Sequence, residues 1–301
     1  MITIIITSYK EPKSTVRAIN AFLEQNFPKD SRIIVCDPFP EVEEYIKENV
    51  KDKRVHFFLD PGEGKAYALN LLFQENYSNN QKDIFILTDG DVYVSKNSLK
   101  EILNTLKDEK VGCITGRPIT TNPRENKYGY WSKVLFDGVD NVRRKISDKG
   151  EFFQCSGYLF AIRNGLIKEF PIDVPEDCII PYLIWKKDYQ IKYVPNAEVY
   201  VQYPDNWKDW LNQRIRIIKA HENISKLYPE MPRTKSFFNE IKKGAFFALA
   251  YPKNLKEFFW TIELFFARLY IYFEAFKSIR KKQVFADGWR ETEIESTKPL
   301  D

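Results

Sequence analysis

Short β-branched runs alternate with longer amphipathic segments over about the first 116 residues of the chain. The short runs lie at 2–7, 32–36, 55–59, 83–88 and 111–115, and the amphipathic segments lie at 14–25, 42–50, 66–76 and 99–106. This strand–helix repeat predicts right-handed βαβ units and a parallel sheet. The strands are apolar throughout, which is typical of strands that helices cover on both faces. The pattern therefore predicts an α/β fold, a Rossmann-type, mostly parallel sheet flanked by helices.

The pattern changes beyond residue 116. We expect helices over 128–146 and 174–188, a strand over 155–163, and a pair of strands over 189–195 and 197–203. A further helix is expected to start near Asn206, and past Pro232 the composition shifts to aromatic and basic residues. The sequence thus predicts a first unit over residues 1–228 and a C-terminal helical extension over residues 229–301.

Composition excludes few classes of protein. With 301 residues, 44% of them hydrophobic, the chain can bury a sizeable core, and 46 basic against 42 acidic residues give no electrostatic reason to expect nucleic acid. The four cysteines have no metal-ligand spacing, which indicates free, buried thiols in a reducing compartment. The N-terminal apolar run is too short for the core of a signal peptide, so we expect a cytoplasmic catalytic part.

Three polar clusters follow predicted strands, at residues 7–11, 36–38 and 88–91. Ligands of such sheets bind at the carboxyl ends of the strands. Asp89 and Asp91 flank Gly90, so both carboxylates can face one point and offer the oxygen ligands that Mg²⁺ or Mn²⁺ prefers. The alternative is an ordinary turn, because Asp-Gly is a common turn dipeptide.

Two further groups carry possible chemistry. Glu176 and Asp177 form a second acidic pair at the start of a predicted helix, where acids often only stabilise the helix end. Gln213 and Arg216 share a helix face and could bind a diphosphate, but a solvated basic face is equally consistent with the spacing. His221 lies close enough in sequence to reach the same site, although a lone helical histidine is usually structural.

Seven short motifs occur in order between Thr7 and Arg216: TSYKE, CDP, GKAYALN, TDGD, SGYLFAIR, PED and QRIR. In this order and spacing they resemble the family 2 glycosyltransferases of the GT-A fold. The resemblance implies a sugar transferred from a nucleotide-sugar donor, with inversion at the anomeric carbon and with Mn²⁺ or Mg²⁺ as cofactor. It covers about three quarters of the chain.

The resemblance also implies roles for the acidic residues. Asp91 would ligate the metal, and Asp89 would contact the ribose and could reach the metal. Asp177 would be the base that deprotonates the acceptor hydroxyl, and Glu176 would help to position the acceptor.

The remaining roles concern the nucleotide. By the same resemblance, the groups around the base and ribose are Ser8, Tyr9, Glu11, Asp37 and Lys65. A carboxylate such as Asp37 accepts a hydrogen bond from the N3–H of uracil or the N1–H of guanine but not from adenine. UDP- or GDP-sugars are therefore favoured as donors over ADP-sugars.

Two positions depart from the family pattern. Pro38 replaces a second aspartate that many members carry, which affects base recognition, and Ile217 replaces the tryptophan that follows this arginine motif in processive members. We therefore expect transfer of one or a few sugars to a saccharide or lipid-linked acceptor. The alternatives are a sugar-nucleotide nucleotidyltransferase, which should carry a glycine-rich loop after the first strand, and an inactive membrane-associated scaffold.

The C-terminal segment raises the question of a membrane. Residues 258–276 are apolar or aromatic apart from one threonine and three charged residues, and central charges cost about 2.5 to 3.5 kcal/mol each on insertion. We therefore expect a helix that lies in the plane of a membrane, with Lys277, Arg280, Lys281 and Lys282 near anionic lipid. The alternative is that it packs against the sheet domain or against a second subunit.

Overall fold

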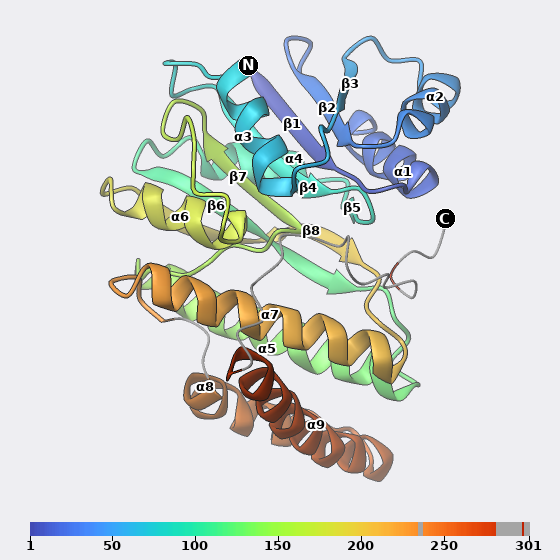
Figure 1. Cartoon of the computed structure of the whole chain (residues 1–301), viewed down its shortest axis with the longest axis vertical. Coiled ribbons are helices and arrows are strands. Elements are labelled where there is room, and N and C mark those ends of the chain that lie inside the picture. The colour runs from blue at the N-terminus through green and yellow to red at the C-terminus, as the bar shows by residue number, and fades with distance from the viewer. Residues whose placement is uncertain (234–236, 281–296, 298–301) are drawn as a thin grey trace.

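A computed structural model describes residues 1–233, residues 237–280 and residue 297 (Figure 1). Within these residues an eight-stranded sheet has the order β3-β2-β1-β4-β7-β6-β8-β5. The strands are β1 (Ile2–Thr7), β2 (Arg32–Asp37), β3 (Val55–Leu59), β4 (Ile84–Asp89), β5 (Tyr93–Val94), β6 (Val111–Thr120), β7 (Leu159–Arg163) and β8 (Gln190–Val201). Strands β1 to β4 pair in parallel, as do β6 and β8, whereas β7 and β5 run antiparallel to their neighbours. The mostly parallel sheet is thus confirmed.

Helices cover both faces of the sheet. They are α1 (Pro12–Leu23), α2 (Pro40–Asn49), α3 (Lys65–Glu75), α4 (Ser98–Thr105), α5 (Lys127–Asp148), α6 (Glu176–Trp185), α7 (Trp207–Leu227), α8 (Phe237–Ala250) and α9 (Leu255–Arg280). Ile5 packs with buried residues of α3 and α6, whereas Ile4 and Ile6 pack with α1, α2 and α4. Side chains alternate between the faces of a strand, so apolar residues at every position bury both faces.

The later strands differ from their predictions. The two strands expected over 189–203 form one strand, β8, and a register shift where it pairs with β6 replaces the expected break. Strand β7 begins only at Leu159, and β5 was not predicted. The four cysteines are free and buried, as expected.

A third core lies below the sheet, where α5, α7 and α9 meet (Figure 1). The ring of Trp131 of α5 packs against that of Trp210 of α7, with a centroid distance of 4.9 Å and an interplanar angle of 50°, and Ile271 of α9 is fully buried in the same cluster. One face of α9 therefore packs against the rest of the protein, as the second alternative for the C-terminal segment predicted. Lys281 and Lys282 lie outside the described residues. No helix within the described ranges combines the length and the apolar character that crossing a bilayer requires.

Candidate active site

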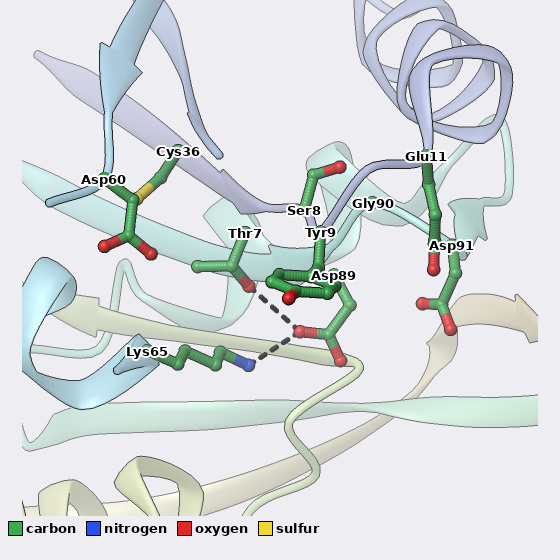
Figure 2. Close-up of a pocket in the computed structure, with 10 residues that line it drawn as sticks. All are labelled: Thr7, Ser8, Tyr9, Glu11, Cys36, Asp60, Lys65, Asp89, Gly90 and Asp91. Atoms are coloured by element: carbon green, nitrogen blue, oxygen red, sulfur yellow. Dashed lines mark hydrogen bonds and ion pairs between the residues drawn. The ribbon is translucent and has the colours of Figure 1, made fainter. Parts of the chain in front are cut away.

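The strand register brings the three predicted polar clusters to one edge of the sheet. Thr7, the last residue of β1, pairs with Cys36 on one side and with Asp89 on the other. A pocket opens at this edge (Figure 2), lined by Thr7, Ser8, Tyr9, Glu11, Cys36, Asp60, Lys65, Asp89, Gly90 and Asp91. Six of these were predicted as nucleotide or metal ligands from sequence. The structure therefore gathers residues from β1, α3 and β4 into one cavity.

Gly90 fits the site because of space. A Cβ atom there would lie 2.8 Å from Thr15 Oγ1 and 2.9 Å from Ser8 Cβ, closer than real Cβ contacts. Ser8 and Thr15 hydroxyls also lie 2.7 Å apart. The glycine thus lets the loop between Asp89 and Asp91 pack directly against the end of β1. This close approach explains the Asp-Gly-Asp sequence better than a turn conformation does.

Asp91 is the most strongly perturbed carboxylate of the pocket. Burial raises its pKa well above the usual range, and the neighbouring carboxylates of Asp89 and Glu11 raise it further. Figure 2 shows the Glu11 and Asp91 side chains on the same side of the pocket. Among the described residues, Asp91 Oδ1 is buried and has no hydrogen-bond partner. An unpartnered, buried carboxylate oxygen of this kind suits a cation.

Lys65 joins the two acidic groups that the sequence placed about ninety residues apart. Its Nζ lies 2.6 Å from Asp89 Oδ1 and 2.7 Å from Glu176 Oε1. Burial by itself lowers the pKa of Lys65, but the two carboxylates outweigh this effect and raise it, so the amine stays charged. Gly64, with φ of 117°, caps α3 and turns the chain so that Lys65 begins the helix. The lysine expected near the nucleobase thus links Asp89 to Glu176.

Asp177 is held in place by backbone groups. Its Oδ2 accepts a hydrogen bond of 3.1 Å from the Gly157 N–H, and its carbonyl accepts one of 3.0 Å from the Cys155 N–H. The buried guanidinium of Arg143 donates to the carbonyls of Gln154 and Cys155. Helix α5 thereby holds the loop before β7, whose N–H groups bind Asp177. Nothing in the sequence pattern singles out Arg143, because its role depends on how α5 packs.

Asp37 lies behind the pocket rather than in its lining. It is fully buried, and its two oxygens accept from the Lys10 N–H at 3.0 Å and the Phe39 N–H at 2.9 Å. Burial raises its pKa, and these hydrogen bonds partly oppose that shift. Lys10 has φ of 58°, which is uncommon for a residue other than glycine. Asp37 therefore fixes the loops that follow β1 and β2, and the contact with a base stays a prediction.

Helix α7 supplies the predicted basic motif. Asn206 caps the helix by accepting from the Asp209 N–H at 3.0 Å, as the expected start near Asn206 required. Gln213 is buried, and its Oε1 has no hydrogen-bond partner among the described residues. His221 is half-buried on the same helix, and its carbonyl accepts from Ser225 Oγ at 2.8 Å. A ligand function of His221 stays a prediction.

Tyr158 connects α7 electrostatically to the aspartates. Burial raises the pKa of its hydroxyl, the charges of Asp91 and Asp89 raise it further, and those of Arg214 and Arg216 lower it. All four charged groups therefore lie near one phenol. Its carbonyl also accepts from Thr88 Oγ1 at 2.7 Å, which ties it to β4. Tyr158 lies within the SGYLFAIR motif, but its residue type gave no reason to single it out.

The residues present fit a single divalent cation that shares its shell with a ligand. No group of three or more histidine, cysteine or acidic side chains capable of holding a metal occurs in the described part of the chain. Mg²⁺ and similar ions bind one or two carboxylates and complete their shell with water and phosphate oxygens. Asp91, with Asp89 beside it, has the composition that such a site needs.

Comparison with known proteins identifies the family of the chain. Residues 1–220 match the family described as "Glycosyltransferase like family 2". The chain is 28% identical over 174 residues to hyaluronan synthase of Streptococcus pyogenes, covering 54% of this chain and 40% of that protein. It is 24% identical over 289 residues to the probable glycosyltransferase YdaM of Bacillus subtilis, covering 88% and 63%, and 23% identical over 240 residues to an N-acetylglucosaminyltransferase of Rhizobium meliloti, covering 71% and 54%.

The chain thus spans about two fifths to two thirds of the length of these relatives. The family match, in contrast, extends over most of the chain and includes every residue of the pocket. It also includes the loop that holds Asp177 and the first two thirds of α7. The chain therefore belongs to glycosyltransferase family 2, whose members transfer a sugar from a nucleotide-sugar donor.

Proposed function

We propose that the protein is an inverting, metal-dependent glycosyltransferase that moves a sugar from a UDP- or GDP-sugar to a hydroxyl or phosphate of a saccharide or lipid-linked acceptor. The observation that carries the proposal is the pair of acidic groups that Lys65 joins through Asp89 and Glu176. Beside Asp89, Asp91 has a buried oxygen with no hydrogen-bond partner among the described residues, and beside Glu176, Asp177 is held by backbone hydrogen bonds.

Asp91, assisted by Asp89, would hold Mn²⁺ or Mg²⁺ together with the donor diphosphate. A cation bound there supplies positive charge that stabilises the departing diphosphate. The local electrostatics support this assignment, because burial and two neighbouring carboxylates disfavour the ionised form of Asp91 in the metal-free protein. Metal binding would relieve that repulsion.

Asp177 would act as the general base. Its carboxylate takes the proton from the acceptor hydroxyl while the acceptor oxygen bonds to the anomeric carbon. The bond from that carbon to the diphosphate oxygen breaks, and its electron pair leaves with the nucleoside diphosphate. Because the base and the leaving group lie on opposite faces of the sugar, the configuration at the anomeric carbon inverts. The hydrogen bond from Gly157 fixes the direction in which the base points.

The nucleotide would lie against the ends of β1 and β2. Ser8, Tyr9 and Glu11 line the pocket there, and Tyr9 packs edge-to-face on Phe39 at a centroid distance of 5.2 Å. We propose that Asp37 selects uracil or guanine over adenine through an N–H donor of the base. A base contact requires the loop that covers Asp37 to open, since its side chain is fully buried.

Gln213 and Arg216 would bind the leaving diphosphate, and Glu176 would position the acceptor once Lys65 turns toward the ligand. The unpartnered oxygen of buried Gln213 supports a polar ligand at this point of α7. Ile217 lacks an aromatic face on which an acceptor sugar could stack, which favours transfer of one or a few sugars over polymer synthesis.

We also propose that the chain consists of two units with different functions. Residues 1–228 would form the catalytic unit and residues 229–301 a helical segment that associates with a membrane or a second subunit, with the enzyme on the cytoplasmic face. The family match, which ends at residue 220, supports this boundary.

A thermal-shift experiment tests the donor and metal assignments. We expect UDP or GDP with Mn²⁺ to raise the melting temperature, because ligands that bind the native state stabilise it, and ADP with Mn²⁺ to have little effect. Asp91→Ala should remove the dependence on Mn²⁺. An equal shift with and without Mn²⁺ in the wild type, or an equal response to ADP, would contradict the proposal.

A further inference from the structure

Helix α9 carries large apolar residues on opposite sides, and the protein covers only one of these sides. The buried side includes Leu264, Ala267, Ile271 and Ala275, which pack against α5 and α7. The opposite side exposes eight large apolar residues, each between 43% and 77% accessible: Leu255, Phe258, Phe259, Phe266, Leu269, Tyr270, Phe273 and Phe276. Their spacing of three or four residues places them on one stripe of the helix. With Phe246 and Leu249 of α8, also exposed, we call these ten residues the outer stripe.

Such exposure is concentrated in this part of the molecule. Eighteen large apolar side chains are exposed in the described part of the chain, and ten of them belong to the outer stripe. Of the other eight, Trp207 lies next to the stripe, with its ring centroid 6.0 Å from that of Tyr270, and the remaining seven are scattered over other elements. Single exposed apolar residues need no explanation, whereas a contiguous patch marks a binding surface.

The three carboxylates of α9 do not prevent binding to an apolar or anionic surface, because each lies close to a basic side chain. Glu257 lies 2.8 Å from Arg124, and Glu263 lies 3.2 Å from Lys127. The third carboxylate, Glu274, lies 3.7 Å from a lysine one turn further along the helix. The acidic charge of the helix is thus neutralised by α5, by the loop before it, and by α9 itself.

Basic residues remain around the stripe. Residues 237–280 contain seven lysines and arginines against four acidic residues. Lys253 and Lys256 are exposed at the start of α9, and Lys256 Nζ lies 4.7 Å from the ring centroid of Trp260. Positive charge at the end of an exposed apolar stripe complements the anionic headgroups and the apolar interior of a lipid bilayer.

A protein partner fits the same surface less well. Protein interfaces carry about one hydrogen bond per 100–200 Å² and place polar groups among the apolar ones. The ten side chains of the outer stripe offer one polar atom, the hydroxyl of Tyr270. Two copies joined through this surface would also bring their basic residues together. A bilayer needs neither hydrogen bonds nor a matching shape.

From these observations we infer that the outer stripe docks the enzyme on an anionic lipid bilayer, with α9 lying in the plane of the surface. The inference is independent of the proposed transfer chemistry. Helix α7 connects the two regions, because Trp210 and Ile218 pack in the core shared with α9 and Gln213 lies on the same helix between them.

The test is sedimentation of the full-length chain with vesicles, either phosphatidylcholine alone or a mixture of phosphatidylcholine and phosphatidylglycerol. Wild type should bind the mixed vesicles more tightly than the neutral ones. For the triple variant Phe259→Ser, Phe266→Ser and Phe273→Ser, the affinity for the mixed vesicles should fall by at least about tenfold, because exposed phenyl rings supply the apolar contact. As a matched control, Val139→Ser, Ile172→Ser and Leu227→Ser remove exposed apolar residues elsewhere and should bind like wild type.

Two outcomes would overturn the inference. The first is wild type that binds neither type of vesicle. The second is a wild-type dimer in size-exclusion chromatography that the triple variant disrupts while vesicle binding stays unchanged, which would identify a second copy as the partner. If the triple variant does not fold, the double variant Lys253→Glu with Lys256→Glu tests the inference instead, since it leaves the apolar residues intact. That double variant should lose the preference for phosphatidylglycerol, and a retained preference would also contradict the inference.

Discussion

The acidic residues at the pocket and those of helix α9 differ in how they are paired. At the pocket, Asp89 and Glu176 share one lysine, Lys65, and buried Asp91 Oδ1 has no hydrogen-bond partner among the described residues. Along α9, each carboxylate has a base of its own, and the uncovered surface is apolar instead. Within the described residues, the pocket therefore contains a carboxylate oxygen without a hydrogen-bond partner, whereas α9 has apolar side chains that no other part of the protein covers.

This difference indicates what each region binds. A buried carboxylate oxygen without a partner is costly, so it persists where a ligand supplies the missing charge or hydrogen bond. A contiguous exposed apolar surface is costly for a different reason, since contact between apolar side chains and water is unfavourable in free energy. The first defect predicts a cation with a diphosphate, and the second predicts lipid. Three substitutions test the comparison, in order of decreasing effect.

Asp177→Asn should have the largest effect, because it removes the proposed base while keeping the size of the side chain. Turnover should fall about 10³-fold, within the range that general-base catalysis contributes, and binding of UDP or GDP with Mn²⁺ should survive. The measurement is release of nucleoside diphosphate from the sugar donor. Asp188→Asn is the control, since Asp188 is exposed and its φ of 64° suits asparagine. Turnover within tenfold of wild type would rule out Asp177 as the base.

Gly90→Ala tests whether the cleft depends on the close approach of two loops. The new methyl group would meet Ser8 and Thr15 at less than 3.0 Å, which forces Asp89 and Asp91 to shift. Overpacking of this kind costs about 1–3 kcal/mol, so the affinity for UDP or GDP with Mn²⁺ should fall at least several-fold. Isothermal titration measures it. Gly244→Ala is the control, because a Cβ there meets nothing within 4 Å, and an unchanged affinity in Gly90→Ala would show that the loop has room.

Glu257→Gln should have a smaller effect, on stability rather than on chemistry. Glu257 accepts two hydrogen bonds of 2.8 Å from the Arg124 guanidinium, and this contact lowers the pKa of the carboxyl below 4.5. We expect a loss of about 2 kcal/mol in the free energy of unfolding at neutral pH. Glu263→Gln should cost less than about 0.5 kcal/mol, because its pair with Lys127 is half-exposed.

The same pair predicts a pH dependence with a defined sign. A carboxyl whose pKa is lowered by folding stabilises the native state above its unfolded pKa, and that contribution is lost as the pH falls through the folded value. The difference between wild type and Glu257→Gln should therefore be largest near neutral pH and should shrink below about pH 4.5. Urea unfolding at several pH values measures it. A difference that grows in acid would contradict the assigned role of Arg124.

The sheet was largely predictable, because its signal is local. Apolar runs of five or six residues separated by amphipathic segments placed β1 to β4 and α1 to α4 within a few residues. The error in β8 has a physical cause. Two strands were expected over 189–195 and 197–203, but β8 continues through Pro195 and Asn196, which lie at a register shift in its pairing with β6, where a proline needs no ladder hydrogen bond.

The site was predictable in its residue types but not in its contacts. Asp89 and Asp91 were identified from their position after a strand, and they do line the pocket. The bridge from Lys65 to Glu176 and the support of the Asp177 loop by Arg143 were not foreseen. These contacts join residues whose separation in sequence carries no periodic signal, so they depend on how separate elements pack.

Residue types and their spacing specify which segments form buried strands, which residues end those strands, and the family to which the ordered motifs point, because these signals are local. The packing of separate elements specifies which charges meet across the pocket and which side of α9 is covered. A helix with large apolar residues on opposite sides does not specify its buried face. That choice is made by the aromatic residues of α5 and α7, against which one stripe of α9 packs while the other stays exposed.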